Sequence, residues 1–374
     1  MKIEPFGVEI WMNEFENDCT HNLAETCVAS LTVQQLLELS GKNDTVLTDL
    51  LPMKMTYGAI EGSDRLRDAI CTLYDHQARE NIVVTHGAIG ANALIHATLI
   101  DPGDHVICVK PTYQQHYSIP ESYGADIEIL HLRPQNQFLP DPDELRAMIR
   151  PDTRLIVINN PNNPTGSLME KAFLREFCEI ARSVGAWVLC DEVYRGTNQH
   201  GSGFAPAIAD IYEKGISVSG MSKAFSLAGL RLGWIAAPVE IMNAVSIHRD
   251  YTTISVGVID DYFAALALES KDKIIARAQA ITRKNLAILS DWVDREPSIS
   301  WIKPMAGTTA LLKYDFDLPS RDLCIALQQQ TGVMLLAGSA LDMEGYVRIG
   351  FANSPEILRE GLARISPFLT ELRE

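Results

Sequence analysis

Residues 222–234 read SKAFSLAGLRLGW and place Lys223 directly after Ser222, with Arg231 between two glycines eight positions further on. A lysine amine forms a Schiff base with an aldehyde, and a guanidinium holds a phosphate with paired hydrogen bonds. The run therefore predicts a binding site for an aldehyde that also carries a phosphate. A solvated loop beginning with Ser-Lys is the alternative for this run taken alone.

A buried carboxylate is predicted at Asp191, which directly follows the apolar run GAWVLC of residues 185–190. Such a short apolar run predicts a parallel strand that is buried on both faces. A side chain at the carboxyl end of this kind of strand faces the crevice where ligands bind in open α/β sheets. Capping of the next helix is the other role open to this aspartate.

Glycines follow a second predicted strand, residues 82–85, in the run THGAIGANAL that ends at residue 94. Glycines between a strand and a helix let backbone amides approach a phosphate at the positive end of the helix. Gly87, Ala88 and Ile89 are therefore predicted to bind phosphate. Plain packing of the helix on the strand also explains a single glycine-rich turn.

Strands and helices alternate from about residue 49 to residue 270, which predicts an α/β fold with a mainly parallel sheet covered on both faces. We expect three units: an N-terminal arm (1–45), a large domain (46–270) and a smaller α+β domain (271–374). The predicted strands are 82–85, 105–109, 126–130, 155–158, 187–190, 215–219 and 231–236, then 302–314, 333–336 and 346–350. The predicted helices include 143–149, 169–184 and a long bridging helix at 266–295.

From Tyr57 to Arg348 these motifs, in this order, resemble the class I and II aminotransferases, fold-type-I pyridoxal-phosphate (PLP) enzymes typified by aspartate aminotransferase. The run NNPNNPTG at residues 159–166 is strongly typical of that family. Dense Asn and Pro otherwise predict only a turn. The resemblance implies a PLP-binding large domain built on a seven-stranded sheet, with a smaller α+β domain beside it.

The resemblance also implies a role for each motif, with PLP as the cofactor. Lys223 forms the Schiff base and serves as the general base, while Asp191 pairs with the pyridine nitrogen. Tyr194 and Asn163 hydrogen-bond the phenolic oxygen of PLP, and Asn163 also borders the substrate. Further cofactor-binding residues are implied at Tyr113, which stacks on the ring, and at Gly87, Ala88, Ile89, Ser222, Arg231 and Tyr57.

The implied activity is transfer of an amino group between an L-amino acid and a 2-keto acid. Arg348 matches the arginine that holds the substrate α-carboxylate, and Tyr57 matches a tyrosine that reaches the active site of the partner in a homodimer. One departure is Gly220, which stands where the family usually has a phosphate-binding hydroxyl.

A second departure is the segment HNLAETCVAS at residues 21–30, which lacks the usual glycine–proline pair. This segment and the opening residues look closer to capreomycidine synthase and its relatives, which act on arginine-type substrates. A PLP-dependent cyclase, lyase or oxidase of an arginine-like amino acid is therefore the alternative activity. Glu14 and Glu25 would then meet the cationic side chain, although both are equally well explained as surface acids.

Charge and composition narrow the possible partners. The 374 residues are 47% hydrophobic, and 48 Asp plus Glu against 32 Lys plus Arg give a net charge of −16. This charge opposes binding to nucleic acid or to an anionic membrane, and no apolar run approaches a membrane span. The negative charge also argues against a DNA-binding transcription regulator built on an aminotransferase-like domain. A catalytically inactive binding module is a further alternative.

The seven cysteines are scattered without C-x-x-C pairs or metal-ligand spacing, so unpaired thiols and no metal site are expected. The opening MKIEPFG lacks the features of a signal peptide. We therefore expect a cytoplasmic enzyme whose partners are small molecules and a second copy of itself.

Overall fold

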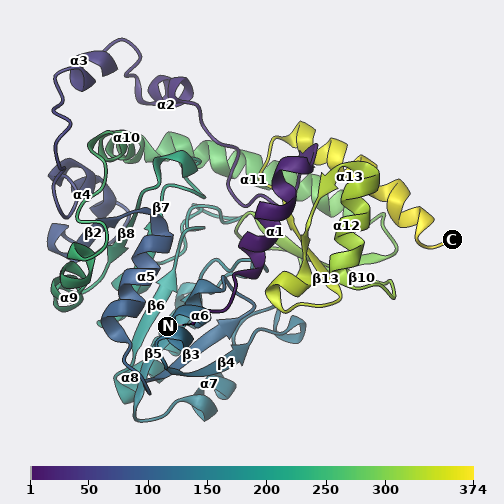
Figure 1. Cartoon of the computed structure of the whole chain (residues 1–374), viewed down its shortest axis with the longest axis horizontal. Helices are drawn as coiled ribbons and strands as arrows, with labels where there is room; N and C mark the ends of the chain where they lie inside the picture. Colours follow the sequence, from purple (N-terminus) through teal and green to yellow (C-terminus); the bar gives the residue numbers. More distant parts are fainter. Residues whose placement is uncertain (1) are drawn as a thin grey trace.

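The largest element of the structure, a computed structural model that describes residues 2–374, is a seven-stranded sheet (Figure 1). Neighbouring strands are parallel except at β8, which is antiparallel to both of its neighbours. The prediction of a mainly parallel seven-stranded sheet is confirmed. In spatial order the strands are β2 (Ile82–Thr85), β8 (Gly233–Ala236), β7 (Gly215–Gly220), β6 (Trp187–Asp191), β5 (Thr153–Asn159), β3 (His105–Lys110) and β4 (Asp126–His131).

Both faces of this sheet are apolar. Successive side chains of a strand point to opposite sides, so a strand made of consecutive apolar residues covers both faces. In β5, Leu155 and Val157 pack into a core cluster with helix α5 (Gly87–Leu99). Ile156 and Ile158 pack into a different cluster with helix α8 (Lys171–Val184). The other helices of this part are α4 (Asp64–Cys71), α6 (Gln115–Ser122), α7 (Pro142–Met148), α9 (Val239–Asp250) and α10 (Val258–Glu269).

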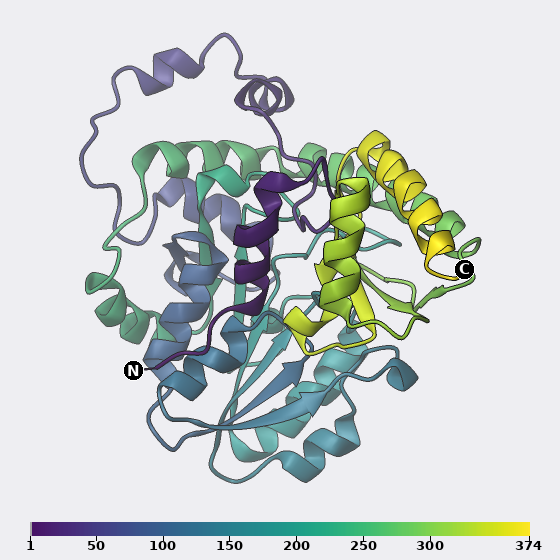
Figure 2. The same ribbon diagram turned by 45° about the vertical axis from the view of Figure 1, so that its right-hand side comes forward.

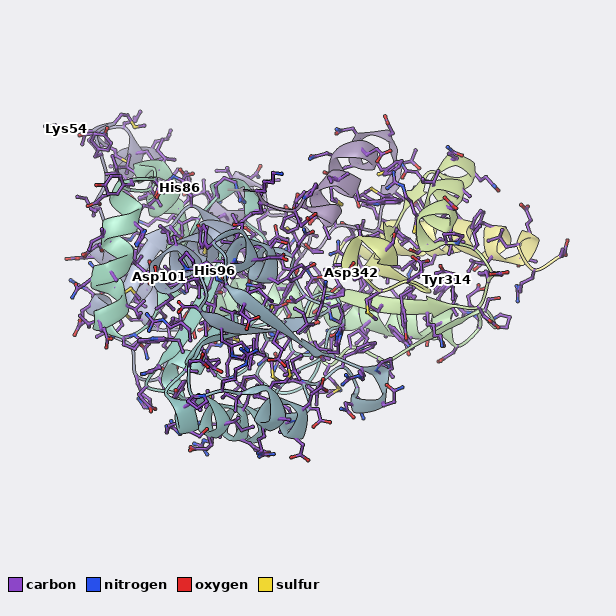
Figure 3. All side chains as sticks on the ribbon, turned by 60° about the horizontal axis from the view of Figure 1, so that its bottom comes forward. Lys54, His86, His96, Asp101, Tyr314 and Asp342 are labelled. Carbon is purple, nitrogen blue, oxygen red and sulfur yellow. The ribbon has the colours of Figure 1, made fainter. Side chains whose placement is uncertain are left out.

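A second, four-stranded antiparallel sheet forms the C-terminal part, in the order β12, β13, β10, β9. The ion pair between Lys110, at the end of β3, and Asp342 joins the two parts at 2.6 Å, and Figure 3 labels Asp342 between them. The bounds are β9 (Ile299–Trp301), β10 (Thr309–Tyr314), β12 (Leu336–Ala337), β13 (Tyr346–Gly350), α11 (Lys271–Val293), α12 (Ser320–Thr331) and α13 (Pro355–Glu371).

The N-terminal segment packs against the C-terminal part. Strand β1 (His21–Asn22) pairs in parallel with β11 (Val333–Met334). Helix α1 (Gly7–Phe15), purple in Figure 2, lies beside α12 and is anchored by a hydrogen bond of 3.0 Å from Trp11 Nε1 to the Leu335 carbonyl. Helices α2 (Val33–Ser40) and α3 (Val46–Leu50) follow on an extended segment (Figure 1), and their residues Leu37 and Val46 pack with Leu266 of α10.

Three predicted elements are wrong in extent. The long helix predicted at 266–295 is two helices, α10 and α11, because Ser270 has φ −108° and ψ 18°, outside the helical region. The strand predicted at 302–314 begins only at Thr309, since the amides of Met305 and Ala306 bind the Gly166 carbonyl instead of a strand neighbour. The strand predicted at 333–336 is divided between β11 and β12.

Within residues 2–374, no helix combines the length and the apolar character that a membrane crossing requires. All seven cysteines are free thiols.

Candidate active site

A cavity of about 390 Å³ lies where the carboxyl ends of β5, β6 and β7 meet β13 and the N-terminal segment. The register of the sheet explains part of this convergence, because Asn159 at the end of β5 pairs with Asp191 at the end of β6. The cavity brings together most of the predicted site residues: Glu25, Ala88, Ile89, Tyr113, Asn163, Asp191, Tyr194, Ser222, Lys223, Arg231 and Arg348.

The side chain of Lys223 points into this cavity from the loop after β7. Its Nζ donates a hydrogen bond of 2.6 Å to Thr26 Oγ1 and lies 3.5 Å from Cys27 Sγ. Burial favours the neutral amine, but interactions with Tyr194, Cys27 and the Glu25 carboxylate outweigh burial and raise the pKa of Lys223. With its pKa raised in this way, the free Lys223 side chain is an ammonium at neutral pH.

Asp191 is 5% exposed and is held by several donors. Its Oδ2 accepts a hydrogen bond of 3.0 Å from Asn92 Nδ2 and lies 3.4 Å from His116 Nε2, while its Oδ1 accepts from the Val193 amide. His96, labelled in Figure 3, lies behind His116, and burial lowers its pKa to about 3, so it supplies no charge. A buried carboxylate in this setting suits a cationic ring nitrogen.

The opposite end of the cavity is built to receive an anion. Gly220 of β7 pairs with Gly233 of β8, and a Cβ on Gly233 would lie 2.4 Å from the Ala88 nitrogen. Only a glycine there allows the N-terminus of α5 to rest on the sheet and present the amides of Ala88 and Ile89 to the cavity. The Arg231 guanidinium lies alongside, since a Cβ on Gly87 would be 3.2 Å from Arg231 Nη2.

This arrangement fits the phosphate of PLP. A helix N-terminus and a guanidinium both attract a dianion. Arg231 adopts a left-handed backbone conformation with φ 47°, which costs about 1–3 kcal/mol for a residue other than glycine. A side chain at Gly220 would have little room, because a Cβ there would lie 3.1 Å from the Leu232 carbonyl oxygen.

Arg348 reaches the cavity from β13 and is 2% exposed. Its Nη1 donates to Asn163 Oδ1 at 3.2 Å and its Nη2 donates to the Ala24 carbonyl at 2.8 Å. Its buried Nε has no hydrogen-bond partner among residues 2–374. Burial of this guanidinium lowers its pKa. An acceptor such as a carboxylate would satisfy the remaining donor.

The comparisons with known proteins agree with this geometry. The family described as aminotransferase class I and II matches residues 49–365 of the chain. The chain belongs to this family. A crystal structure titled as a PLP-dependent aminotransferase from Streptococcus suis 89-1591 is 43% identical, covers 100% of both chains and has a TM-score of 0.97.

Two curated relatives are similar over most of their length. Capreomycidine synthase of Streptomyces vinaceus is 31% identical over 306 residues, which cover 82% of this chain and 78% of the relative. An arginine–pyruvate transaminase of Pseudomonas aeruginosa is 26% identical over 341 residues, which cover 87% of this chain and 85% of the relative. The prediction of a PLP-dependent aminotransferase is confirmed.

Three predicted site residues of the aminotransferase do not line the cavity in this chain. Glu14 projects from α1 and pairs with Arg321 of α12 at 2.9 Å. Tyr57 lies in the extended segment after α3 and is 78% exposed. Glu14 is therefore not placed to meet a substrate, while the prediction for Tyr57 depends on a partner subunit. Gly87 contributes backbone space for Arg231 and does not line the cavity itself.

The N-terminal segment of the aminotransferase contributes residues that the sequence motifs missed. Val8, Glu9 and Met12 of α1 line the cavity, as do Glu16, Thr26 and Cys27. Glu9 Oε1 accepts a hydrogen bond of 3.0 Å from the Tyr113 hydroxyl, so α1 is tied to the predicted ring-stacking residue. No motif marks these positions; the one available signal is that residues 21–30 depart from the family pattern.

Proposed function

We propose that the aminotransferase carries an amino group from an L-amino acid to a 2-keto acid with PLP held at Lys223. The observation that carries this proposal is the convergence of Lys223, Asp191, Arg231 and Arg348 on one cavity. When bound there, PLP supplies an aldehyde that accepts the amino group and a ring that withdraws electrons from the substrate α-carbon.

The buried carboxylate of Asp191 would hold the proton on the ring nitrogen of the cofactor. Asn163 and Tyr194 would hydrogen-bond the phenolic oxygen, and Tyr113 would stack on the ring. Burial raises the pKa of Tyr194 even though Lys223 and Arg348 oppose that effect, so its phenol donates a hydrogen bond. Arg231, Ser222 and the amides of α5 bind the phosphate.

Lys223 is the residue that moves protons. With PLP loaded, its amine would hold the cofactor through the aldehyde group and, once the substrate amine has displaced it, would take the proton from the substrate α-carbon. The same amine would then be the group placed to give that proton back. Arg348 holds the substrate α-carboxylate through two parallel hydrogen bonds, which fixes the α-carbon within reach of Lys223.

The experiment for this proposal is a panel of amino acids tested with and without a 2-keto acid. We expect the purified protein to convert an amino donor catalytically only when a keto acid such as pyruvate or 2-oxoglutarate is present. One equivalent of donor is expected to react in its absence, because the cofactor then stays aminated. Continued turnover without any keto acid would contradict transamination and support the cyclase, lyase or oxidase alternative.

We also propose that the amino donor carries a cationic side chain. Three carboxylates, Glu9, Glu16 and Glu25, line the N-terminal side of the cavity. Burial and the nearby charges of Glu25 and Glu9 raise the pKa of Glu16, which means that these carboxylates repel one another. Arg348 and Arg231 are assigned to the substrate carboxylate and the phosphate, so a substrate cation would relieve this repulsion. One relative, the arginine–pyruvate transaminase, is named for an amino donor with a cationic side chain, which supports the same proposal.

Glu25→Gln tests this specificity without changing the shape of the side chain. Glu25 Oε1 accepts from the amides of Thr26 and Cys27, and an amide oxygen keeps both bonds. We expect KM for arginine to rise about 10- to 100-fold, since a hydrogen bond to a charged group contributes about 1.5–3 kcal/mol. KM for a neutral donor is expected to change little. Glu14→Gln removes an equal charge outside the cavity and is expected to alter neither value; equal effects of both variants would contradict the proposal.

A homodimer is proposed as the working form. The extended segment exposes apolar side chains at Leu47, Leu51, Met55 and Tyr57, which are 63–79% exposed. Large apolar side chains exposed in number on one segment are typical of a surface that a partner covers. In this proposal Tyr57 completes the phosphate site of the partner subunit. Sedimentation at several concentrations tests it, and a mass that remains near 41.4 kDa would contradict it.

A further inference from the structure

The hydroxyl of Thr26 contacts the one amine on which the proposed chemistry depends. Lys223 Nζ donates to Thr26 Oγ1 at 2.6 Å, the shorter of its two hydrogen bonds, and Cys27 Sγ is the second acceptor at 3.5 Å. Sulfur is a weak acceptor, so the threonine hydroxyl is the stronger partner. Thr26 is 9% exposed, and bulk water therefore competes little for this bond.

The backbone around Thr26 is fixed on both sides. Its amide donates to Glu25 Oε1 at 2.7 Å, and its carbonyl accepts from Thr308 Oγ1 at 2.7 Å. Two residues further on, the Val28 amide donates to the Lys223 carbonyl at 3.4 Å. The N-terminal segment is thus bonded to the lysine loop itself, and the hydroxyl has a set position relative to the amine.

The same hydroxyl also acts on Tyr194. Burial raises the pKa of the Tyr194 phenol, and the proximity of Thr26 is one of the effects that lower it. Thr26 is therefore near both the lysine amine and the tyrosine that borders the proposed phenolic oxygen of the cofactor. The charged and titratable groups facing Lys223 here are Tyr194, Glu25 and Cys27.

We propose that Thr26 is a positioning residue for Lys223: its hydroxyl receives the lysine amine whenever that amine is not bonded to the cofactor and keeps it at the cavity wall. This inference rests on the proposed function of Lys223. An amine without such a partner would sample several rotamers, and loss of a fixed reacting geometry lowers the rate of proton transfer.

Thr26→Val removes the hydroxyl and keeps the branched shape, and Thr26→Ser keeps the hydroxyl. With a saturating amino donor, we expect Thr26→Val to lower kcat about 10- to 100-fold with KM changed less than about threefold. Thr26→Ser is expected to restore most of kcat. An unchanged kcat in Thr26→Val, or an equal loss in Thr26→Ser, would overturn the proposal.

A second measurement does not depend on turnover. In full-length protein freed of cofactor, the rate of acetylation of Lys223 by acetic anhydride, followed by peptide mass spectrometry over a pH series, reports the pKa of the amine. A hydroxyl that accepts from the ammonium stabilises the charged form, so Thr26→Val is expected to lower the midpoint by about one pH unit. Thr26→Ser is expected to match the unaltered chain.

The two measurements separate this inference from the proposed function. If the unaltered protein shows no amino-group transfer, the proposed function fails while the acetylation series still tests Thr26. If transfer occurs and Cys27→Ala, rather than Thr26→Val, shifts the acetylation midpoint, the sulfur is the partner of the amine and the inference about Thr26 is wrong.

Discussion

Replacing Lys223 by alanine is expected to lower kcat for amino-group transfer by about 10⁴-fold or more, because the change removes both the amine that binds the aldehyde and the general base. The visible absorption of the lysine-bound cofactor is expected to disappear as well. PLP should still bind to this variant, because Arg231 and the amides of α5 are unchanged, but its affinity should be lower because the bond to the lysine is lost. Stopped-flow kinetics and an absorption spectrum of the variant measure both effects.

Lys171→Ala is the matched control for this variant. Lys171 lies at the start of α8, is exposed and lines no part of the active-site cavity. Its loss is expected to leave the spectrum and kcat unchanged. An unaltered absorption band in Lys223→Ala would show that another lysine binds the aldehyde, and the whole assignment of the cavity would then be wrong.

The second large effect is expected at Asp191. Asp191→Asn keeps the volume of the side chain and removes its charge, and the ring nitrogen then loses the carboxylate that keeps it protonated. We expect kcat to fall about 10²- to 10³-fold, which is typical for removal of one preorganised electrostatic contact to the reacting group. The lysine-bound cofactor should still form, because Lys223 and the phosphate site are intact. We therefore expect the Asp191→Asn variant to lose turnover but to keep the absorption band of the lysine-bound cofactor, at a shifted wavelength.

Asp294→Asn controls for the loss of one negative charge from the chain. Asp294 lies at the exposed C-terminal end of α11, away from the cavity. It is expected to keep full activity. If Asp191→Asn retained more than about half of kcat, the carboxylate would not support the ring, and its buried contacts with Asn92 and His116 would be structural only.

The sequence predicted the parts of the fold whose signal is local. Strands β2 and β13 have the predicted bounds, since each is a short apolar or alternating run between clear turn residues. The convergence of Asp191, Asn163 and Lys223 on one cavity was predictable for a related reason. Asp191 ends a buried strand and the other two follow one, and parallel strands bring their carboxyl ends to one edge.

The N-terminal wall of the cavity was not predictable in the same way. On α1, Glu9 and Met12 are three residues apart and share a face, whereas Glu14 lies on another side of the helix. Which face meets the cavity is decided by the bond from Trp11 to the Leu335 carbonyl, a contact more than 300 residues away in the chain. No local pattern carries that information, and so Glu14 was predicted in place of Glu9.

The break at Ser270 has the same kind of cause. The sequence between residues 266 and 295 contains neither glycine nor proline, so its pattern predicts one helix. Helix α10 instead packs against α4, where Asp261 accepts a hydrogen bond of 2.8 Å from the Ser63 amide, and α11 turns to pack against α13. Tertiary contacts at both ends outweigh the helical propensity of one serine.

The central claim is that one amine, that of Lys223, binds the cofactor aldehyde. Reduction of the cofactor-loaded protein with borohydride followed by peptide mass spectrometry tests it most directly, because reduction makes the bond permanent. The account predicts one pyridoxyl-phosphate group per chain, on the peptide that contains Lys223. A label on any other lysine, or none at all, would contradict it.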